Sequence, residues 1–313
     1  VKAAYGAVLC RSGALAAWLR VRPGRRHPWI LNYHHIEPQA FEGHLRALAR
    51  HYRIVTLDAC CEHLAGGAPL APNSVVLTFD DGYRQLCGQL FPLLERYGAP
   101  ATVFVPTDPV DTREPLWFNR VKTLVRTTAA AALSAGGQEF PLGPDREAAY
   151  VAVMRHLNRQ SVAARDAMLR ELLGGVELPA DRLERYEPLT WAEMRASPSP
   201  GSYGGHTRSH PRLSRLPRAE AEAEIRGSKE RLEEMLGVPV RHFAYPFGGP
   251  DSFTGETVEL VRAAGFTSAV TTARGACRQG GSLYRLPRIL CDGSVGGSVV
   301  AARLSGLWLF VTT

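Results

Sequence analysis

Short apolar runs alternate along this chain with longer segments in which apolar residues recur every three or four positions. The short runs predict strands at residues 29–33, 52–56, 74–79, 101–105, 242–245 and 266–271. The longer segments predict helices at residues 41–51, 86–97 and 219–236, the last with Gly237 just beyond its end. Strands that alternate with helices in this way are typical of β/α units built around a parallel sheet.

The alternation stops between residues 108 and 194, where the sequence is rich in Ala and Arg and offers no convincing strand. We interpret this stretch as a helical insertion between two barrel units. The 313 residues suffice for one large α/β domain. We expect a catalytic domain at 28–292, a helical segment at 1–27 and a tail or helix at 293–313.

The formal net charge of +7 comes almost entirely from arginine, since the only lysines are Lys2, Lys122 and Lys229. The basic residues are scattered, which favours a basic soluble protein over a nucleic-acid or anionic-lipid binder. Six cysteines without C-x-x-C spacing predict buried, reduced thiols and a reducing compartment: Cys10, Cys60, Cys61, Cys87, Cys277 and Cys291.

Both ends of the chain carry an apolar stretch. Arg11 interrupts the first, at residues 3–10, and no clean cleavage site follows, so we do not predict a signal peptide. The second, residues 299–311, contains Arg303 and is too short to span a bilayer, which needs about 20 apolar residues. We expect a packed or membrane-touching terminal helix, and a location in the cytoplasm or at the inner membrane surface.

The first segment that indicates chemistry is an apolar strand ending in Asp80, Asp81 and Gly82. Active sites of parallel β/α proteins assemble at the carboxyl ends of strands. Adjacent carboxylates repel, and a metal ion can hold one while the other acts as a base. The sequence fits equally well a turn in which Asp caps a helix and Gly supplies an unusual backbone angle.

Two further segments contain candidate site residues. His206 and His210, between Gly204-Gly205 and Pro211, could ligate one ion together with a carboxylate. The stretch 242–249 is an apolar strand that enters a turn rich in aromatic residues, Pro and Gly. That turn could wall a sugar site, or it could be an ordinary tight turn.

The three segments resemble, in order, the motifs of the polysaccharide deacetylase family, the carbohydrate esterases that include nodulation chitooligosaccharide deacetylases. Residues 78–82 read T-F-D-D-G, residues 206–210 read H-T-x-x-H, and residues 245–248 read Y-P-F-G. The resemblance spans roughly residues 30–289 and is weakest in the insertion. It implies an α/β fold, a distorted (β/α) barrel of about seven parallel strands, with the site at their carboxyl ends.

The resemblance also implies a metal-dependent hydrolase that removes the acetyl group of an N-acetylated glycan. Asp81, His206 and His210 would bind a divalent ion, Zn²⁺ or alternatively Co²⁺, Ni²⁺ or Mn²⁺, and Asp80 would be the general base. A backbone N–H at Phe247 would stabilise the oxyanion. The expected substrate-binding residues are Tyr245, Pro246, Phe247 and Gly248.

The sequence departs from the family pattern at two positions. Ala244 stands where an Arg commonly orients the base, and no histidine follows His242 to serve as the usual general acid. We hypothesise that His34, at the end of the first strand, is the acid, and that Arg288 orients Asp80. The alternative for His34 is a position in a solvated turn without a catalytic role, and the alternative for Arg288 is an ordinary surface arginine.

Two other functions fit the same motifs. The fold could host a hydrolase of another carbon–nitrogen bond, such as that of a small cyclic amide. The chain could also be an impaired carbohydrate-binding homologue, although both carboxylates and both histidines remain. The sequence does not predict the glycan or the oligomeric state.

Overall fold

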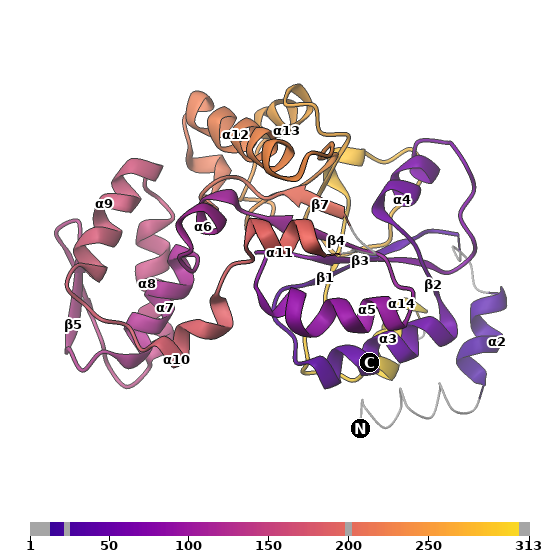
Figure 1. Cartoon of the computed structure of the whole chain (residues 1–313), viewed down its shortest axis with the longest axis horizontal. Helices are drawn as coiled ribbons and strands as arrows, with labels where there is room; N and C mark the ends of the chain where they lie inside the picture. Colours follow the sequence, from indigo (N-terminus) through magenta and orange to yellow (C-terminus); the bar gives the residue numbers. More distant parts are fainter. Residues whose placement is uncertain (1–12, 22–25, 198–201, 307–313) are drawn as a thin grey trace.

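A computed structural model describes residues 13–21, 26–197 and 202–306. Figure 1 shows a central parallel sheet covered by helices, with a lobe of helices to one side. Seven strands run in the order β10-β1-β3-β4-β7-β8-β9, and β2 pairs with β3 off this path. The strands of this sheet are β1 (Trp29–Tyr33), β2 (Arg53–Ile54), β3 (Ser74–Phe79), β4 (Ala101–Val105), β7 (Ser202–Gly205), β8 (His242–Ala244), β9 (Ser268–Val270) and β10 (Ile289–Leu290).

A single segment near the C-terminus joins the two edges of this curled sheet. The backbone N–H of Leu286 donates to Ala269 of β9, and the N–H of Thr271 donates to the Leu286 carbonyl. Three residues later, β10 pairs in parallel with β1. The sheet is therefore a distorted (β/α) barrel, as predicted, and the segment 286–290 fills the gap between its first and last strands.

Helices cover the outside of the barrel. In Figure 1, α12 and α13 lie above the sheet, whereas α3, α5 and α14 lie below it. These helices and the strands share one hydrophobic core. The helices outside the insertion are α2 (Ala14–Val21), α3 (Pro38–His51), α4 (Leu57–Leu64), the π-helix η1 (Leu86–Leu90), α5 (Phe91–Arg96), α12 (Arg218–Leu236), α13 (Gly255–Ala263) and α14 (Gly297–Leu304), with 3₁₀ turns η3 (Leu213–Arg215) and η4 (Leu283–Arg285).

None of the helices among the described residues is long and apolar enough to cross a membrane. The five described cysteines are all unpaired, and four of them are buried. The whole apolar stretch 3–10, with Cys10, lies outside the described residues, as do residues 307–313.

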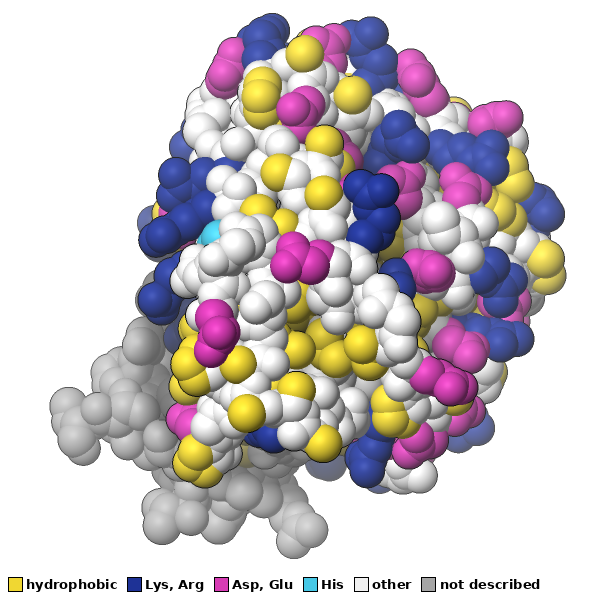
Figure 2. All heavy atoms as spheres, turned by 90° about the vertical axis from the view of Figure 1, so that its left-hand side faces the viewer, with side chains coloured by type: hydrophobic (Ala, Val, Ile, Leu, Met, Phe, Trp, Pro, Cys, Tyr) yellow, Lys and Arg dark blue, Asp and Glu magenta, His cyan; other side chains and the backbone are white. Residues whose placement is uncertain are grey.

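The insertion forms, over residues 117–183, the lobe on the left of Figure 1, which has a hydrophobic cluster of its own. Its helices are α6 (Thr107–Thr112), α7 (Trp117–Thr127), α8 (Arg146–Leu157), α9 (Val162–Leu173), α10 (Ala180–Leu183), the 3₁₀ turn η2 (Glu184–Tyr186) and α11 (Trp191–Ala196). The view onto this lobe in Figure 2 shows hydrophobic side chains toward the middle and Lys and Arg side chains along the edges.

The expectation that the insertion contains no strand was wrong. An antiparallel hairpin, β5 (Ala132–Ala135) and β6 (Gln138–Pro141), lies within it. Its two-residue loop is Gly136-Gly137, and both glycines have positive φ, of 56° and 76°. Such a pair is a strong hairpin signal, which outweighs the helical propensity of the preceding alanines.

The remaining differences are local. The predicted helix 86–97 is a π-helix followed by α5, with Pro92 in the first turn of α5, where a missing N–H costs nothing. Strand β7 was not predicted because Ser-Tyr-Gly-Gly has low strand propensity. Its glycines are required by packing, since a Cβ on Gly204 would lie 2.5 Å from the Phe104 ring.

Candidate metal centre and active site

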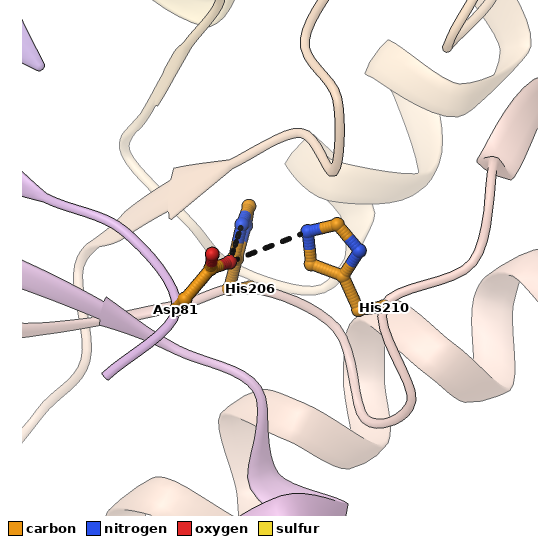
Figure 3. Close-up of side chains that lie close together, drawn as sticks. All are labelled: Asp81, His206 and His210. Carbon is orange, nitrogen blue, oxygen red and sulfur yellow. Dashed lines mark ion pairs between the residues drawn. The ribbon is translucent and has the colours of Figure 1, made fainter. Parts of the chain in front are cut away.

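Three side chains from distant parts of the chain meet at the carboxyl end of the sheet. Asp81 follows β3, and His206 and His210 lie on the loop that follows β7. The Asp81 Oδ1 lies 3.6 Å from the His206 Nε2 and 3.5 Å from the His210 Nε2. Figure 3 shows both rings directed at this oxygen. One ligand atom from each residue lies within 4.8 Å of the others, and all three residues are buried.

The donor set fits a divalent ion. Asp81 Oδ1 is buried and has no hydrogen-bond partner among the described residues, an arrangement that is costly unless something positive binds there. The His206 Nδ1 lies 2.7 Å from the Ala244 carbonyl oxygen, which favours protonation at Nδ1 and leaves the Nε2 lone pair facing Asp81. Burial and the neighbouring His206 lower the pKa of His210 to about 3, so its imidazole is neutral, as a ligand must be.

Backbone conformation around the site is strained. Asp81, Thr207, His210 and Phe247 all have positive φ, between 56° and 70°. This region is unfavourable for residues other than glycine, particularly for β-branched threonine, and each instance costs about 1–3 kcal/mol. Four strained residues at one site indicate that the surrounding structure fixes the positions of the three loops that carry them.

Buried polar contacts hold the histidine loop in place. The Thr207 Oγ1 accepts a hydrogen bond from the His210 N–H at 3.0 Å. The Glu224 carboxylate of α12 accepts hydrogen bonds from the N–H groups of Arg208 and Ser209 at 2.8 and 2.9 Å. The indole N–H of Trp117 donates to the His210 carbonyl at 3.3 Å. The insertion, through Trp117, therefore helps to position a candidate ligand.

A second contact from the insertion reaches Asp81. The Tyr83 hydroxyl donates to Asp81 Oδ2 at 2.8 Å and accepts from the Asn119 side chain at 2.9 Å. This chain of contacts orients the carboxylate so that Oδ1 faces the histidines. Tyr83 directly follows the segment T-F-D-D-G at residues 78–82, whereas nothing in the sequence links Asn119, on an insertion helix, to the site.

Asp80 lies beside Asp81 but is anchored separately. The Arg288 guanidinium donates two hydrogen bonds to the two carboxylate oxygens of Asp80, both at 2.7 Å. Both side chains are buried, with Arg288 fully enclosed. Burial alone would raise the pKa of Asp80, but the charge and hydrogen bonds of Arg288 lower it below its usual value. Arg288 lies in the segment that closes the barrel. It provides the guanidinium contact to Asp80 that Ala244, at the position where the family commonly has Arg, cannot make.

His34 lies at the mouth of the site. Its Nε2 is 3.8 Å from the Asp80 Oδ2, and 40% of its side chain is exposed. The structure therefore brings His34 to the same rim as Asp80, within reach of a molecule bound there.

The third motif places one accessible side chain at the site. Phe247 packs edge-on to the His210 ring, with centroids 4.9 Å apart, and its backbone N–H donates to no described residue. Gly248 has a φ of 60°, and a Cβ there would lie 2.8 Å from the Thr272 nitrogen. Tyr245 is 1% exposed and stacks on Phe253, so its side chain belongs to the core. Among the four expected substrate-binding residues, Tyr245, Pro246 and Gly248 are buried, and Phe247 is partly exposed.

This chain is similar in sequence to known polysaccharide deacetylases. The family model for polysaccharide deacetylase matches residues 67–137 and 148–269. YxkH of Bacillus subtilis (strain 168), named as a candidate polysaccharide deacetylase, is 20% identical over 302 residues, covering 93% of this chain and 81% of its own.

Solved structures share the fold. The Streptococcus pyogenes deacetylase PplD, in complex with acetate, superimposes with a TM-score of 0.60 and 18% identity, covering 88% of this chain and 96% of its own. IcaB from Ammonifex degensii gives a TM-score of 0.59 and 20% identity, covering 90% and 97%. The chain is therefore a hydrolase of carbon–nitrogen bonds other than peptide bonds. Because the family model covers more than half of its length, this chain belongs to the polysaccharide deacetylase family.

Proposed function

We propose that this protein removes N-acetyl groups from an N-acetylated glycan, with one divalent ion held by Asp81, His206 and His210. The observation that carries the proposal is the pairing of two adjacent carboxylates in different environments. Asp81 presents an oxygen without a hydrogen-bond partner to two histidine nitrogens. Asp80 is held by two hydrogen bonds from Arg288, whereas the ion pairs of His206 and His210 are with Asp81. One carboxylate is therefore suited to a metal and the other to a proton.

An ion at this position would polarise the acetyl carbonyl and acidify the attacking water. Asp80 is placed to accept the proton of that water, because Arg288 keeps its carboxylate ionised at neutral pH. The Phe247 N–H, which has no acceptor among the described residues, is available to the oxyanion of the tetrahedral intermediate.

Release of the amine requires a proton donor on the same rim. His34 is the half-exposed imidazole beside Asp80, and histidine can donate a proton near neutral pH. We assign it the role of general acid. Its exposure suits this role, since the group must exchange protons with solvent between turnovers.

The test is acetate release from N-acetylglucosamine oligomers by protein that has been stripped of metal and reloaded with Zn²⁺, Co²⁺, Ni²⁺ or Mn²⁺ in turn. We expect release only from reloaded protein. Bound ion without acetate release from any oligomer would contradict glycan deacetylation, and a panel of small cyclic amides would then test hydrolysis of another carbon–nitrogen bond.

A further inference from the structure

A cavity of about 470 Å³ lies between the insertion and the barrel, next to the candidate site. Helix α8 and the residues after it form one wall, and the loop after His210 and the third motif form the other. Its lining residues include four arginines, Arg155, Arg159, Arg212 and Arg215, with Asp251 as the single carboxylate.

The cavity and the candidate site share Phe247. One contact of its ring is the His210 ring, with centroids 4.9 Å apart. Another is the Arg212 guanidinium, which lies 5.0 Å from the ring centroid. This aromatic side chain therefore lies between a candidate metal ligand and an arginine of the cavity. A sugar chain that extends from the site past Phe247 would enter the cavity.

The positive charge in the cavity is largely uncompensated. Asp251 is paired with Arg212 at 2.8 Å. Arg155, Arg159 and Arg215 form no ion pair within the described parts of the chain, and all three are exposed. Arg155 lies in the last turn of α8 and Arg159 lies two residues beyond its end, and both line the cavity, where like charges repel. Elsewhere, arginines of α12 have acidic neighbours, as Arg226 has Glu222 and Arg231 has Glu234.

We propose that this cavity binds an anionic group, a phosphate or a carboxylate, carried by the glycan near the acetamide that is hydrolysed. Guanidinium groups bind both anions through paired, charge-assisted hydrogen bonds. Phe247 and the partly buried Tyr150 and Met154 supply an apolar floor on which a sugar ring can lie. The inference rests on the proposed deacetylation and narrows its substrate to an acidic glycan.

The experiment compares the double variant Arg155→Gln/Arg159→Gln with a matched control, Arg53→Gln/Arg278→Gln. The control removes two exposed arginines that lie toward the opposite, amino end of the strands. Arg53 begins β2. Arg278 follows Cys277, whose backbone N–H donates a hydrogen bond to the carbonyl of Pro28, just before β1. Substrates are neutral N-acetylglucosamine oligomers, the same oligomers carrying phosphate monoesters, and oligomers carrying carboxylates.

For the cavity variant, we expect KM for one anionic series to rise about ten-fold, equivalent to about 1.4 kcal/mol, while kcat/KM for neutral oligomers is unchanged. The series that is affected identifies the anion. The difference should shrink as salt is added, because these charges are exposed. Equal losses on neutral and anionic oligomers, or no loss on either anionic series, would overturn the proposal.

A binding measurement separates this inference from deacetylation itself. N-acetylglucosamine 6-phosphate and N-acetylmuramic acid are titrated calorimetrically into metal-free protein. The cavity variant should bind one of them about ten-fold more weakly than wild type and the control variant do. Identical affinities in all three proteins would overturn the proposal whether or not acetate is ever released. Loss of affinity in the cavity variant would support it even if the deacetylation assay failed.

Discussion

Replacing Arg288 with glutamine tests whether this arginine keeps Asp80 ready to accept a proton. The substitution removes a fully enclosed guanidinium that donates two hydrogen bonds of 2.7 Å to the carboxylate. Removing one partner of a buried ion pair costs about 3–5 kcal/mol, because the other charge stays buried without compensation. Asp80 can avoid this cost by taking up a proton.

The expected rise in the pKa of Asp80 follows from the free-energy cost of leaving its charge buried and unpaired. At about 1.36 kcal/mol per pKa unit, 3–5 kcal/mol corresponds to roughly 2–4 units. His34 and the bound ion retain part of the positive potential, so we expect the lower end, about 2 units. The pKa of Asp80, held below its usual value in the wild type, would then rise above that usual value.

The assay is the pH dependence of kcat/KM for acetate release, which reports ionisations of the free enzyme. In Arg288→Gln the acid limb should move upward by about 2 pH units, with turnover at high pH partly retained. Arg285→Gln, an exposed change in the same segment, should leave the profile unchanged, and Arg288→Lys should restore it in part. Bound metal is measured at every pH, because acid also protonates the histidines. A profile that coincides with wild type would refute the reasoning.

Arg288→Gln should also reverse the way in which ionisation of Asp80 changes the stability of the fold with pH. A carboxylate whose folded pKa is depressed contributes stability above its unfolded pKa, near 3.9, and that stability is lost as pH falls through the folded pKa. In Arg288→Gln, protonation instead relieves the buried charge. The melting temperature of the variant should therefore approach that of wild type as the pH falls from 8 to 5. A gap that stays constant over this range would contradict the change of sign.

Three other predictions follow from individual contacts. Tyr83→Phe removes the hydrogen bond to Asp81 and should weaken Zn²⁺ affinity about 10–100-fold, measured by chelator competition; unchanged affinity would contradict a positioning role. His34→Ala should lower kcat by about 10²–10⁴-fold with metal still bound, and full turnover would exclude it as the acid. Burial lowers the pKa of His44, so its contribution to stability is present above pH 6.5 and falls as pH decreases; His44→Asn should flatten the pH dependence of the melting temperature between pH 7 and 5.

The elements that the sequence predicted well are those whose signal is local. The buried strand 74–79 and helix 219–236 have a clear period, and their bounds agree with β3 and α12 to within one residue. The strand-end position of Asp80 and Asp81 follows from the same periodicity. The hairpin of the insertion was also locally encoded, by Gly136-Gly137, but the surrounding alanines favoured helix.

The parts that could not be predicted depend on contacts between distant residues. The pairing of Arg288 with Asp80 could be hypothesised from the sequence only beside the alternative of an ordinary surface arginine. The two residues are 208 positions apart, and closure of the barrel by the segment of Arg288 brings them together. Trp117 and Asn119 support the site from the insertion, where no motif marks them. The positive φ values of Asp81, Thr207, His210 and Phe247 are imposed by the tertiary structure, against the preferences of those residue types.

The division of labour between the two adjacent carboxylates can be tested in one paired measurement. Asp80→Asn and Asp81→Asn are each loaded with Zn²⁺, and bound metal and acetate release are measured on the same samples, with wild type alongside. We predict that Asp80→Asn binds one equivalent of Zn²⁺ and releases no acetate, whereas Asp81→Asn loses both. Turnover by Asp80→Asn near the wild-type rate, or wild-type Zn²⁺ affinity in Asp81→Asn, would contradict the assignment of base and ligand.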